Sequence, residues 1–222
     1  MILFVATETA EKYRNGGGHK AKMTLEDRAK DHCLVVHYKQ VSRKLLRDVQ
    51  PWAICHSGRG TPFDQDEVLT TPGYRWAIRS SGVPQIGFCG GHQIIAAYFG
   101  STLGNMRPIG PDDADHCPTY HPGLFKEYGT YPVRVVQRDP LFRGLPDVFR
   151  VHEAHRQEVK ELSPDLVLLA SSADCRVQAF LHRRKTIYGT QFHPEAASEH
   201  SPDGFRILAN FFRIARAYKP KG

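Results

Sequence analysis

Short apolar runs alternate with amphipathic stretches along the chain. The apolar runs predict seven β-strands, at residues 2–5, 33–37, 52–55, 85–88, 166–170, 177–181 and 187–192. Apolar residues at helical spacing predict helices at 24–31, 41–49, 66–79, 91–99 and 202–218. This alternation is typical of an α/β domain, and we expect a three-layer α/β/α fold with a mostly parallel central sheet.

The end of the chain refines this picture. The last two predicted strands are joined by a polar turn at 182–185, which predicts that part of the sheet is antiparallel. The final helix follows Ser201-Pro202, an N-cap residue and a proline suited to the first helical position. Its apolar residues share one face, so we expect this helix to pack on the sheet.

Two segments show neither periodicity and are expected to be surface loops. Residues 11–22 contain three consecutive glycines, and this loop is a lid over a site, a docking loop for a partner, or a mobile surface insertion. Residues 105–123 are rich in Pro, Gly and Asp. The acidic run 112–117 contains metal-ligand residue types, but its spacing fits no standard metal site, and we expect a solvated acidic loop.

Length and charge narrow the class of protein. A chain of 222 residues with 41% hydrophobic content is enough for one domain with a sizeable core, and we expect a single domain over 1–222. The net charge of +7 is concentrated at 39–47 and 183–185, without the interleaved aromatic residues of a nucleic-acid site. The longest apolar run, 94–99, is far below the roughly 20 residues of a membrane span. We therefore expect no nucleic-acid and no membrane partner.

The cysteines and the N-terminus indicate the compartment. Five cysteines, an odd number, are scattered at positions 33, 55, 89, 117 and 175 without a C-x-x-C pair. The first residues lack the basic region and the long apolar stretch of a signal peptide. These features predict a reducing, cytoplasmic location, in which one thiol is available for special chemistry.

The stretch 83–100 carries the strongest chemical signal. An apolar strand runs into Cys89, glycines stand at 87 and 91, and a helix follows at once. This is the nucleophile-elbow pattern with cysteine in place of serine. The glycines remove Cβ atoms where strand and helix cross, the helix N-terminus stabilises a thiolate, and the N–H of Gly90 faces an oxyanion. The alternative is a buried structural cysteine.

A histidine and a carboxylate follow the last predicted strand, in the run Gln191-Phe192-His193-Pro194-Glu195. Proline keeps the preceding residue extended, and residues i and i+2 of an extended segment share a face. Glu195 is therefore placed to orient the imidazole of His193, as in a Cys-His-Glu triad with Cys89. Without a nucleophile, the pair would be an exposed His and Glu at a strand end.

A glycine-rich loop, Ser57-Gly58-Arg59-Gly60-Thr61-Pro62, follows another short buried strand. Free N–H groups in such a loop bind anions, so Gly58 is the candidate for a second oxyanion donor beside Gly90. The same loop would equally suit a phosphate or an ordinary turn.

Together these motifs resemble the class I glutamine amidotransferases, a family with a Cys-His-Glu triad. The family pattern G-x-C-x-G-x-Q matches Gly87, Cys89, Gly91 and Gln93, the Q-F-H-P-E signature matches 191–195, and the oxyanion loop matches 57–62. The three motifs occur in the family's order along nearly the whole chain. The resemblance implies the flavodoxin-like fold of that family.

The resemblance also implies a mechanism for glutamine hydrolysis. Cys89 attacks the side-chain amide, and the N–H groups of Gly58 and Gly90 stabilise the oxyanion. His193 carries the proton to the leaving ammonia, Glu195 orients His193, and water hydrolyses the thioester. This reaction needs no metal and no organic cofactor.

The substrate pocket matches the family less well. Gln93 stands at the position that helps hold glutamine. Members usually hold the glutamine backbone with a segment resembling x-N-H-x-x-x-V, and here Ala154 stands where asparagine is common, before His155, Arg156 and Gln157. We take His155 and Arg156 as substrate-binding candidates, with Arg156 either pairing a substrate carboxylate or serving as a surface charge. The expected substrate is glutamine or a related γ-glutamyl amide.

Three hypotheses for the function follow. One is an amidohydrolase that passes ammonia in trans to a synthetase or synthase subunit. Another is a free-standing hydrolase of a different γ-glutamyl amide, and the third is a non-catalytic binding or regulatory module with this fold. Intact Cys89, His193 and Glu195 disfavour the last. The expectation is therefore a cysteine-dependent enzyme.

Overall fold

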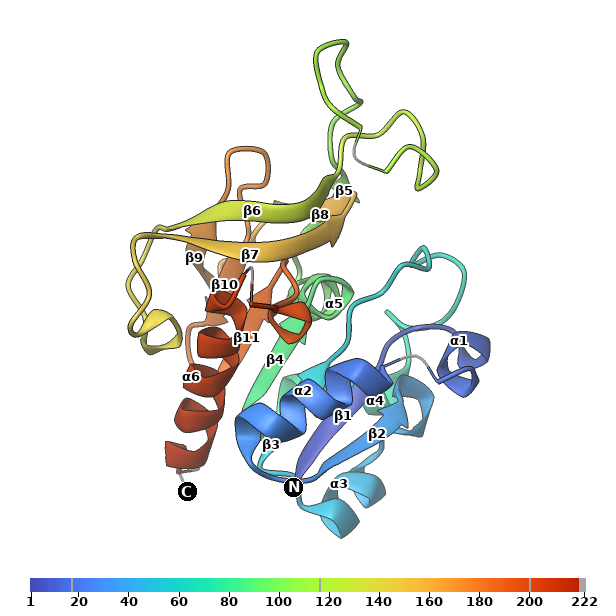
Figure 1. Cartoon of the computed structure of the whole chain (residues 1–222). Coiled ribbons are helices and arrows are strands. Elements are labelled where there is room, and N and C mark those ends of the chain that lie inside the picture. Colours follow the sequence, from blue (N-terminus) through green and yellow to red (C-terminus); the bar gives the residue numbers. More distant parts are fainter. Residues whose placement is uncertain (17, 116, 200, 220–222) are drawn as a thin grey trace.

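The computed structural model describes residues 1–16, 18–115, 117–199 and 201–219. Within these residues the main sheet has nine strands in the order β2-β1-β3-β4-β11-β10-β9-β6-β7, and β5 pairs with β8 in a second sheet (Figure 1). The strands are β1 (Ile2–Ala6), β2 (Cys33–His37), β3 (Ala53–His56), β4 (Gln85–Phe88), β5 (Thr102–Asn105), β6 (Glu127–Val135), β7 (Val148–His155), β8 (Gln157–Glu161), β9 (Leu166–Ser171), β10 (Ala179–His182) and β11 (Ile187–Thr190).

The helices alternate with the strands over the first half of the chain and return at its end. The α-helices are α1 (Ala10–Arg14), α2 (His19–Ala29), α3 (Arg43–Val49), α4 (Pro72–Ser80), α5 (Gly90–Tyr98) and α6 (Asp203–Ala217). Short 3-10 helices are η1 (Tyr38–Gln40), η2 (Pro140–Phe142) and η3 (Pro194–Ala196). None of the helices in the described ranges is long and apolar enough to cross a membrane.

The sheet changes character along its width. Strands β2, β1, β3, β4 and β11 are parallel to one another, whereas β10, β9, β6 and β7 are paired antiparallel. The hairpin expected around residues 182–185 is therefore confirmed as β10 and β11. The parallel part matters for function, because the carboxyl ends of parallel strands share one edge of the sheet.

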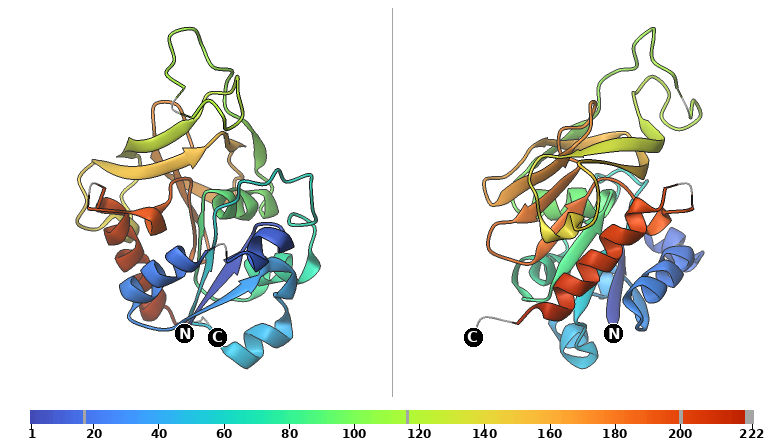
Figure 2. Two further views of the ribbon diagram at one scale, coloured as in Figure 1. Left: turned by 45° about the vertical axis from the view of Figure 1, so that its right-hand side comes forward. Right: turned by 60° about the vertical axis from the view of Figure 1, so that its left-hand side comes forward.

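Two separate cores show the three layers. Side chains of β1 alternate, so that Ile2 and Phe4 enter one core and Leu3 and Val5 enter the other. Helices α2 and α6 contribute to the first core and are in contact with each other (Figure 2). Helices α3, α4 and α5 contribute to the second. The predicted three-layer α/β/α architecture is confirmed.

Four strands escaped the sequence pattern: β5, β6, β7 and β8. Strand β7 alternates buried and exposed positions, but the buried ones include Glu153 and His155 together with apolar residues. Strand β6 contains Gly129 and Pro132, which weaken a strand signal. A charged group can be buried in a strand when a partner elsewhere in the fold pairs with it. A local pattern of apolar residues does not reveal such strand positions.

The first expected loop contains helical structure. Residues 10–14 form α1, capped by Thr9, and α2 begins at His19 rather than at residue 24. The expected loop at 11–22 is thus wrong in part.

Two other helices begin at residues different from those expected. The helix expected at 66–79 begins only at Pro72, which occupies a position in its first turn, and α6 has Pro202 rather than Ser201 at its N-cap.

The second expected loop is confirmed for the described residues. Among the described residues between β5 and β6, the regular pairing is an isolated bridge of Pro108 with Leu124, and this segment extends away from the sheet (Figure 1). Two aspartates of the acidic run are paired, since Asp113 bonds Arg107 and Asp115 bonds Lys126. His116 of the same run lies outside the described residues.

Candidate active site

Three neighbouring parallel strands bring the predicted motifs together. Strand β4 pairs with β3 on one side and with β11 on the other. Gly58, Cys89 and His193 follow the ends of β3, β4 and β11, respectively, and all three line one cavity of about 510 Å³. The structure therefore places the expected nucleophile, base and oxyanion loop at one edge of the sheet.

Cys89 occupies a sharp turn between strand and helix. Its backbone has φ 45° and ψ −104°, a conformation that residues with a side chain rarely adopt. Its N–H donates to the Thr190 carbonyl at 2.8 Å, and its carbonyl accepts from the Gln93 N–H at 3.0 Å. Helix α5 begins at the next residue, Gly90, so the thiol lies at a helix N-terminus.

Glycine is required at both predicted crossing positions. A Cβ on Gly87 would lie 2.5 Å from the carbonyl of Gly91, and a Cβ on Gly91 would lie 2.6 Å from the carbonyl oxygen of His56. Both contacts are with backbone atoms, which have no room to yield. The close approach of α5 to β4 at Gly87, and to the end of β3 at Gly91, thus explains the spacing of glycines around Cys89.

His193 is held from two sides. Its N–H donates to the His152 carbonyl at 2.9 Å, and its ring Nδ1 lies 2.7 Å from Oε1 of Glu195, with the two side chains 17% and 9% exposed. Burial opposes protonation of His193, but Glu195 and Cys89 outweigh it and hold the pKa of this imidazole well above its usual value. Glu195, the largest of the contributions that raise this pKa, therefore favours the protonated form of His193.

The oxyanion loop is oriented by Thr7, which follows β1. The Thr7 hydroxyl lies 3.2 Å from the Ser57 carbonyl oxygen and 3.1 Å from that of Gly58. Because N–H and C=O point in opposite directions across a trans peptide, the N–H groups of Gly58 and Arg59 face away from Thr7. A Cβ on Gly58 would lie 2.6 Å from Cε1 of His193, so this loop and the imidazole are in tight contact.

Arg59 fastens the same loop from inside the protein. Its fully buried guanidinium donates to the carbonyls of Thr7, Thr61 and Pro62 and lies 3.0 Å from Asp66. The guanidinium thereby supplies donors to the carbonyls of Thr7 and Thr61, whereas the Pro62 carbonyl also accepts from the Gln65 N–H at 3.3 Å. The sequence motif contains Arg59 but gives no sign of this role.

Glu8 fixes the far end of the loop. Its carboxylate accepts from the Gly60 N–H and from the Thr61 hydroxyl, each at 2.6 Å. Burial raises the pKa of Glu8, but these bonds and Lys12 outweigh burial and hold it below its usual value. Because the Gly60 N–H donates to Glu8, it is not free to donate to an oxyanion.

Gln93 and Arg156 lie beside Cys89 in a small polar hollow. The amide nitrogen of Gln93 donates to the Gln157 carbonyl at 2.7 Å and to Oε1 of Gln191 at 2.9 Å. Arg156 is 7% exposed, and its guanidinium donates to Asn105 at 2.8 Å. Its buried Nε has no hydrogen-bond partner among the described residues. Arg156 is therefore a wall residue of the site rather than a free surface charge.

His155 also lines this hollow, but its imidazole is buried and bonded within the protein. Its Nε2 lies 2.8 Å from Glu127 and 3.3 Å from Glu153, and its Nδ1 donates to the Gln157 carbonyl at 3.0 Å. Both nitrogens therefore act as donors, as in an imidazolium. The two carboxylates outweigh burial and hold the pKa of His155 well above its usual value. Burial raises the pKa of Glu153 to about 7, against the opposing effect of His155.

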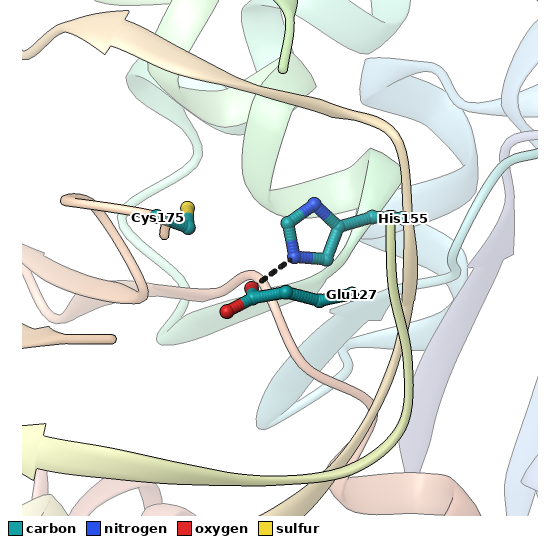
Figure 3. Close-up of side chains that lie close together, drawn as sticks. All are labelled: Glu127, His155 and Cys175. Atoms are coloured by element: carbon teal, nitrogen blue, oxygen red, sulfur yellow. Dashed lines mark hydrogen bonds and ion pairs between the residues drawn. The ribbon is translucent and has the colours of Figure 1, made fainter. Parts of the chain in front are cut away.

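Glu127, His155 and Cys175 have ligand atoms within 4.8 Å of one another, which is close enough to consider a metal ion (Figure 3). The Glu127 carboxylate already accepts from Ser172 at 2.6 Å and from Gln178 at 2.7 Å, in addition to His155. A hydrogen bond joins Glu127 and His155 directly (Figure 3). The donor atoms of these two residues are thus used within the protein, and the cluster is a buried ion pair.

The partners of His155 were not predictable from the sequence. Glu127 and Glu153 both lie in strands that the apolar pattern does not reveal, and Glu127 is 28 positions from His155. An acidic residue alone in a strand gives no local signal of a buried partner. His155 itself lies in the run that resembles the family's glutamine-binding segment. That resemblance predicts a contact of His155 with the substrate and not an ion pair inside the protein.

Comparison with known proteins agrees with these features. The family model described as glutamine amidotransferase class-I matches residues 34–215. A glutamine-hydrolysing GMP synthase subunit of Pyrococcus abyssi is 39% identical over 132 residues, which cover 60% of each chain. The protein of the same name from Archaeoglobus fulgidus is 31% identical over 198 residues, 89% of this chain and 92% of the relative.

Solved structures agree with the fold. A Thermoplasma acidophilum protein described as a GMP synthase subunit superposes with a TM-score of 0.77 at 27% identity, over 98% of this chain and 95% of the other. A glutamine amidotransferase from Thermotoga maritima has a TM-score of 0.70 at 14% identity, over 98% and 99% of the two chains, and shares the fold. The flavodoxin-like arrangement implied by the motifs is confirmed, and the chain belongs to the class-I glutamine amidotransferase family.

Proposed function

We propose that this protein hydrolyses the side-chain amide of glutamine to glutamate and ammonia, with Cys89 as nucleophile. The observation that carries the proposal is the meeting of Cys89 with the bonded pair His193 and Glu195 at the carboxyl ends of adjacent strands. The raised pKa of His193 supports the proposal, because a protonated imidazole next to a cysteine stabilises the thiolate, which is the nucleophilic form.

The reaction divides into two steps. In the first, the Cys89 sulfur bonds to the amide carbon, and the N–H groups of Gly58 and Gly90 hold the oxyanion. His193 gives its proton to the departing nitrogen, the C–N bond breaks and ammonia leaves. In the second, His193 takes a proton from water, which attacks the thioester and releases glutamate. Glu195 keeps the imidazole oriented throughout.

Arg156 is proposed to bind the carboxylate of glutamine, because this buried arginine lines the polar hollow next to Cys89 and its Nε has no partner among the described residues. Gln93 is proposed to support the same wall, since its amide nitrogen already donates to Gln157 and Gln191. His155 is proposed to act differently from the sequence-based expectation. Its Nδ1 and the amide of Gln93 both donate to the Gln157 carbonyl, so His155 holds this wall in place without touching the substrate.

We propose further that the ammonia is used by a separate synthetase subunit. The relatives named above are glutamine-hydrolysing subunits of GMP synthase, and they are the basis for this partner. The matched segment spans about 60% of the length of the Pyrococcus relative. The acceptor is therefore proposed only as a synthetase that uses ammonia. A cytoplasmic location fits five cysteines that are all free thiols.

A covalent label tests the proposed nucleophile. A glutamine analogue with a diazoketone in place of the amide should modify Cys89 and add one γ-glutamyl-type group per chain, as read by peptide mass spectrometry. Excess glutamine should slow the labelling. Labelling at Cys117, which lines the same cavity, with Cys89 untouched would refute the proposal.

A further inference from the structure

Tyr120 stands between the two hollows that meet at Cys89. The smaller hollow is lined by Cys89, Arg156 and their neighbours, and the larger cavity by Cys89 and His193 among others. Tyr120 lines both of them. It belongs to the long segment between β5 and β6, which extends away from the sheet (Figure 1). One side of the catalytic edge is thus closed by a residue that none of the three sequence motifs contains.

The small hollow has no room for a substrate while Tyr120 is in place. Its volume is about 10 Å³, whereas a cavity needs roughly 10–15 Å³ to hold a single water molecule. The ammonium and carboxylate groups of glutamine need several times that space. The charged end of glutamine therefore cannot lie beside Arg156 in the conformation that the structure shows.

The Tyr120 hydroxyl is close to both the nucleophile and the arginine. Burial raises the pKa of this phenol, and Cys89 and Glu8 raise it further. The charge of Arg156 and a hydrogen bond from it lower the pKa without reversing the shift. The phenol therefore stays neutral, and its oxygen accepts from the guanidinium that is proposed to hold the substrate carboxylate.

Two other lysine or arginine side chains line these hollows, and both are paired with carboxylates of the protein. Lys12 pairs with Glu8, and the fully buried Arg59 pairs with Asp66. Arg156 instead donates to a neutral side-chain amide. A glutamine carboxylate placed in the large cavity would have to displace one of these ion pairs. Arg156 is therefore the better partner, and the site must open beside it.

A buried lysine holds the turn that carries Tyr120. The side chain of Lys126 is 2% exposed, donates to the His121 carbonyl at 3.2 Å and pairs with Asp115 at 3.0 Å. His121 has φ 49°, a left-handed conformation that is uncommon for residues with a side chain. The residues on either side of Tyr120 and His121 are exposed. Lys126 thus ties the turn 118–124 to the start of β6, and the outer side of this turn faces solvent.

We propose that Tyr120 closes the glutamine site, and that glutamine binds only after the turn 118–124 has moved Tyr120 away from Arg156. The inference rests on the proposed hydrolysis of glutamine. Moving the phenol joins the small hollow to the larger cavity and releases the guanidinium for the substrate carboxylate. The free protein is closed, so part of the binding free energy of glutamine is used to open it.

The affinity for glutamine tests the closure directly. Binding is measured by titration calorimetry in the Cys89→Ala background, so that it does not depend on turnover. Adding Tyr120→Ala should tighten binding at least about tenfold, because no closing contact has to be broken. Tyr120→Phe should tighten it less, since the ring still fills the hollow. Tyr218→Ala, at the C-terminal end of α6, is the matched control and should leave the affinity unchanged.

Two results with Tyr120→Ala would overturn the proposal. An unchanged affinity would show that Tyr120 does not close the site. A weaker affinity would make Tyr120 part of the wall that binds the substrate. Glutamine binding that is absent both with and without Tyr120→Ala would overturn the closure together with the glutamine site itself.

Loosening the turn gives a second variant that leaves the Tyr120 ring in place. In the same background, Lys126→Met should tighten glutamine binding at least about threefold, because the closed turn loses its bonds to Lys126. Combined with Tyr120→Ala, the same substitution should have no further effect. An unchanged affinity in folded Lys126→Met protein, or an equal gain with and without Tyr120, would contradict control of the site by this turn.

Turnover separates this inference from the proposed function. Ammonia release from glutamine is measured with wild-type protein, Tyr120→Ala and Cys89→Ala. We expect release that depends on Cys89, with a KM at least about tenfold lower in Tyr120→Ala. Cys89-dependent release with equal KM in wild type and Tyr120→Ala refutes only the closure. Tighter glutamine binding by Tyr120→Ala without Cys89-dependent release refutes the proposed hydrolysis and leaves the closure intact.

Discussion

A Cβ atom on Gly58 would lie 2.6 Å from Cε1 of His193, closer than real Cβ atoms approach a neighbour. The oxyanion loop and the base are therefore packed as one unit, although they are far apart in the sequence. Any change that moves the loop also moves the imidazole. This contact makes Gly58 a sensitive probe of the site.

We expect Gly58→Ala to lower kcat for glutamine hydrolysis by about tenfold to a hundredfold, because the added methyl displaces either His193 or an oxyanion donor. The fold should persist, since only one contact is strained. Gly104→Ala is the control, because its Cβ would meet only the flexible chain of Lys160. Unchanged kcat in Gly58→Ala would show that loop and imidazole do not act together.

Arg59 gives a second prediction, on stability. Arg59→Lys should lower the free energy of unfolding by about 2–4 kcal/mol, because one ammonium cannot satisfy three carbonyls and Asp66 as the guanidinium does. Urea melts of this variant and of Arg134→Lys, an exposed position in β6, measure the difference. Equal effects of the two substitutions would contradict the structural role of Arg59.

Glu195 should set the pH dependence of the reaction. Burial opposes protonation of His193, and Glu195 is the strongest of the groups that raise its pKa. The imidazolium form is lost as pH rises through this pKa, so Glu195→Gln should move the alkaline limb of kcat/KM to lower pH. Glu195→Ala should reduce the rate less than Cys89→Ala, because Glu195 orients and does not react. Glu199→Gln, a change at an exposed position, is the control and should leave the alkaline limb where it is in wild type. The same unchanged limb in Glu195→Gln would argue against the pairing of Glu195 with His193.

Glu153 should make stability fall as pH rises. Burial raises its pKa from 4.5 to about 7 in the folded protein, so the folded state binds more protons than the unfolded state between these values. The substitution Glu153→Gln removes the carboxylate and with it this decrease in the free energy of unfolding. The free energy of unfolding of Glu153→Gln, relative to wild type, should therefore increase by roughly 1–3 kcal/mol between about pH 5 and pH 8.

Denaturant melts at several pH values test this prediction, with Glu161→Gln as a control at an exposed position of β8. A stability difference between Glu153→Gln and wild type that stays constant with pH would mean that the Glu153 pKa is not raised by folding. A constant difference for Glu161→Gln is expected.

Local chemistry made the catalytic edge predictable. The strand, turn and helix around Cys89 follow from glycines that remove specific backbone clashes, and each clash involves neighbours in sequence or in the adjacent strand. The short spacing of His193 and Glu195 likewise brings the two side chains together, although Glu195 lies in the 3-10 helix η3 and not in the extended segment that the sequence predicts. Such constraints act over a few residues, so the sequence displays them.

Long-range contacts were not predictable from the same patterns. Thr7 and Glu8 hold a loop 50 to 53 positions away, and Glu127 pairs with His155, whose strand β7 buries charged as well as apolar residues. The helix at 10–14 depends on a Thr9 cap and on contacts of Lys12 with Thr61, beside a run of glycines that indicates a loop. These interactions arise only when the sheet is assembled.

Ammonia release from glutamine by wild-type protein and Cys89→Ala, each with and without the proposed synthetase partner, tests the central claim most directly. Cys117→Ala is the matched control, since Cys117 lines the same cavity. We predict that Cys89→Ala lowers the rate by at least about a thousandfold while Cys117→Ala retains it. Full activity of Cys89→Ala would contradict the assignment of Cys89 as the nucleophile.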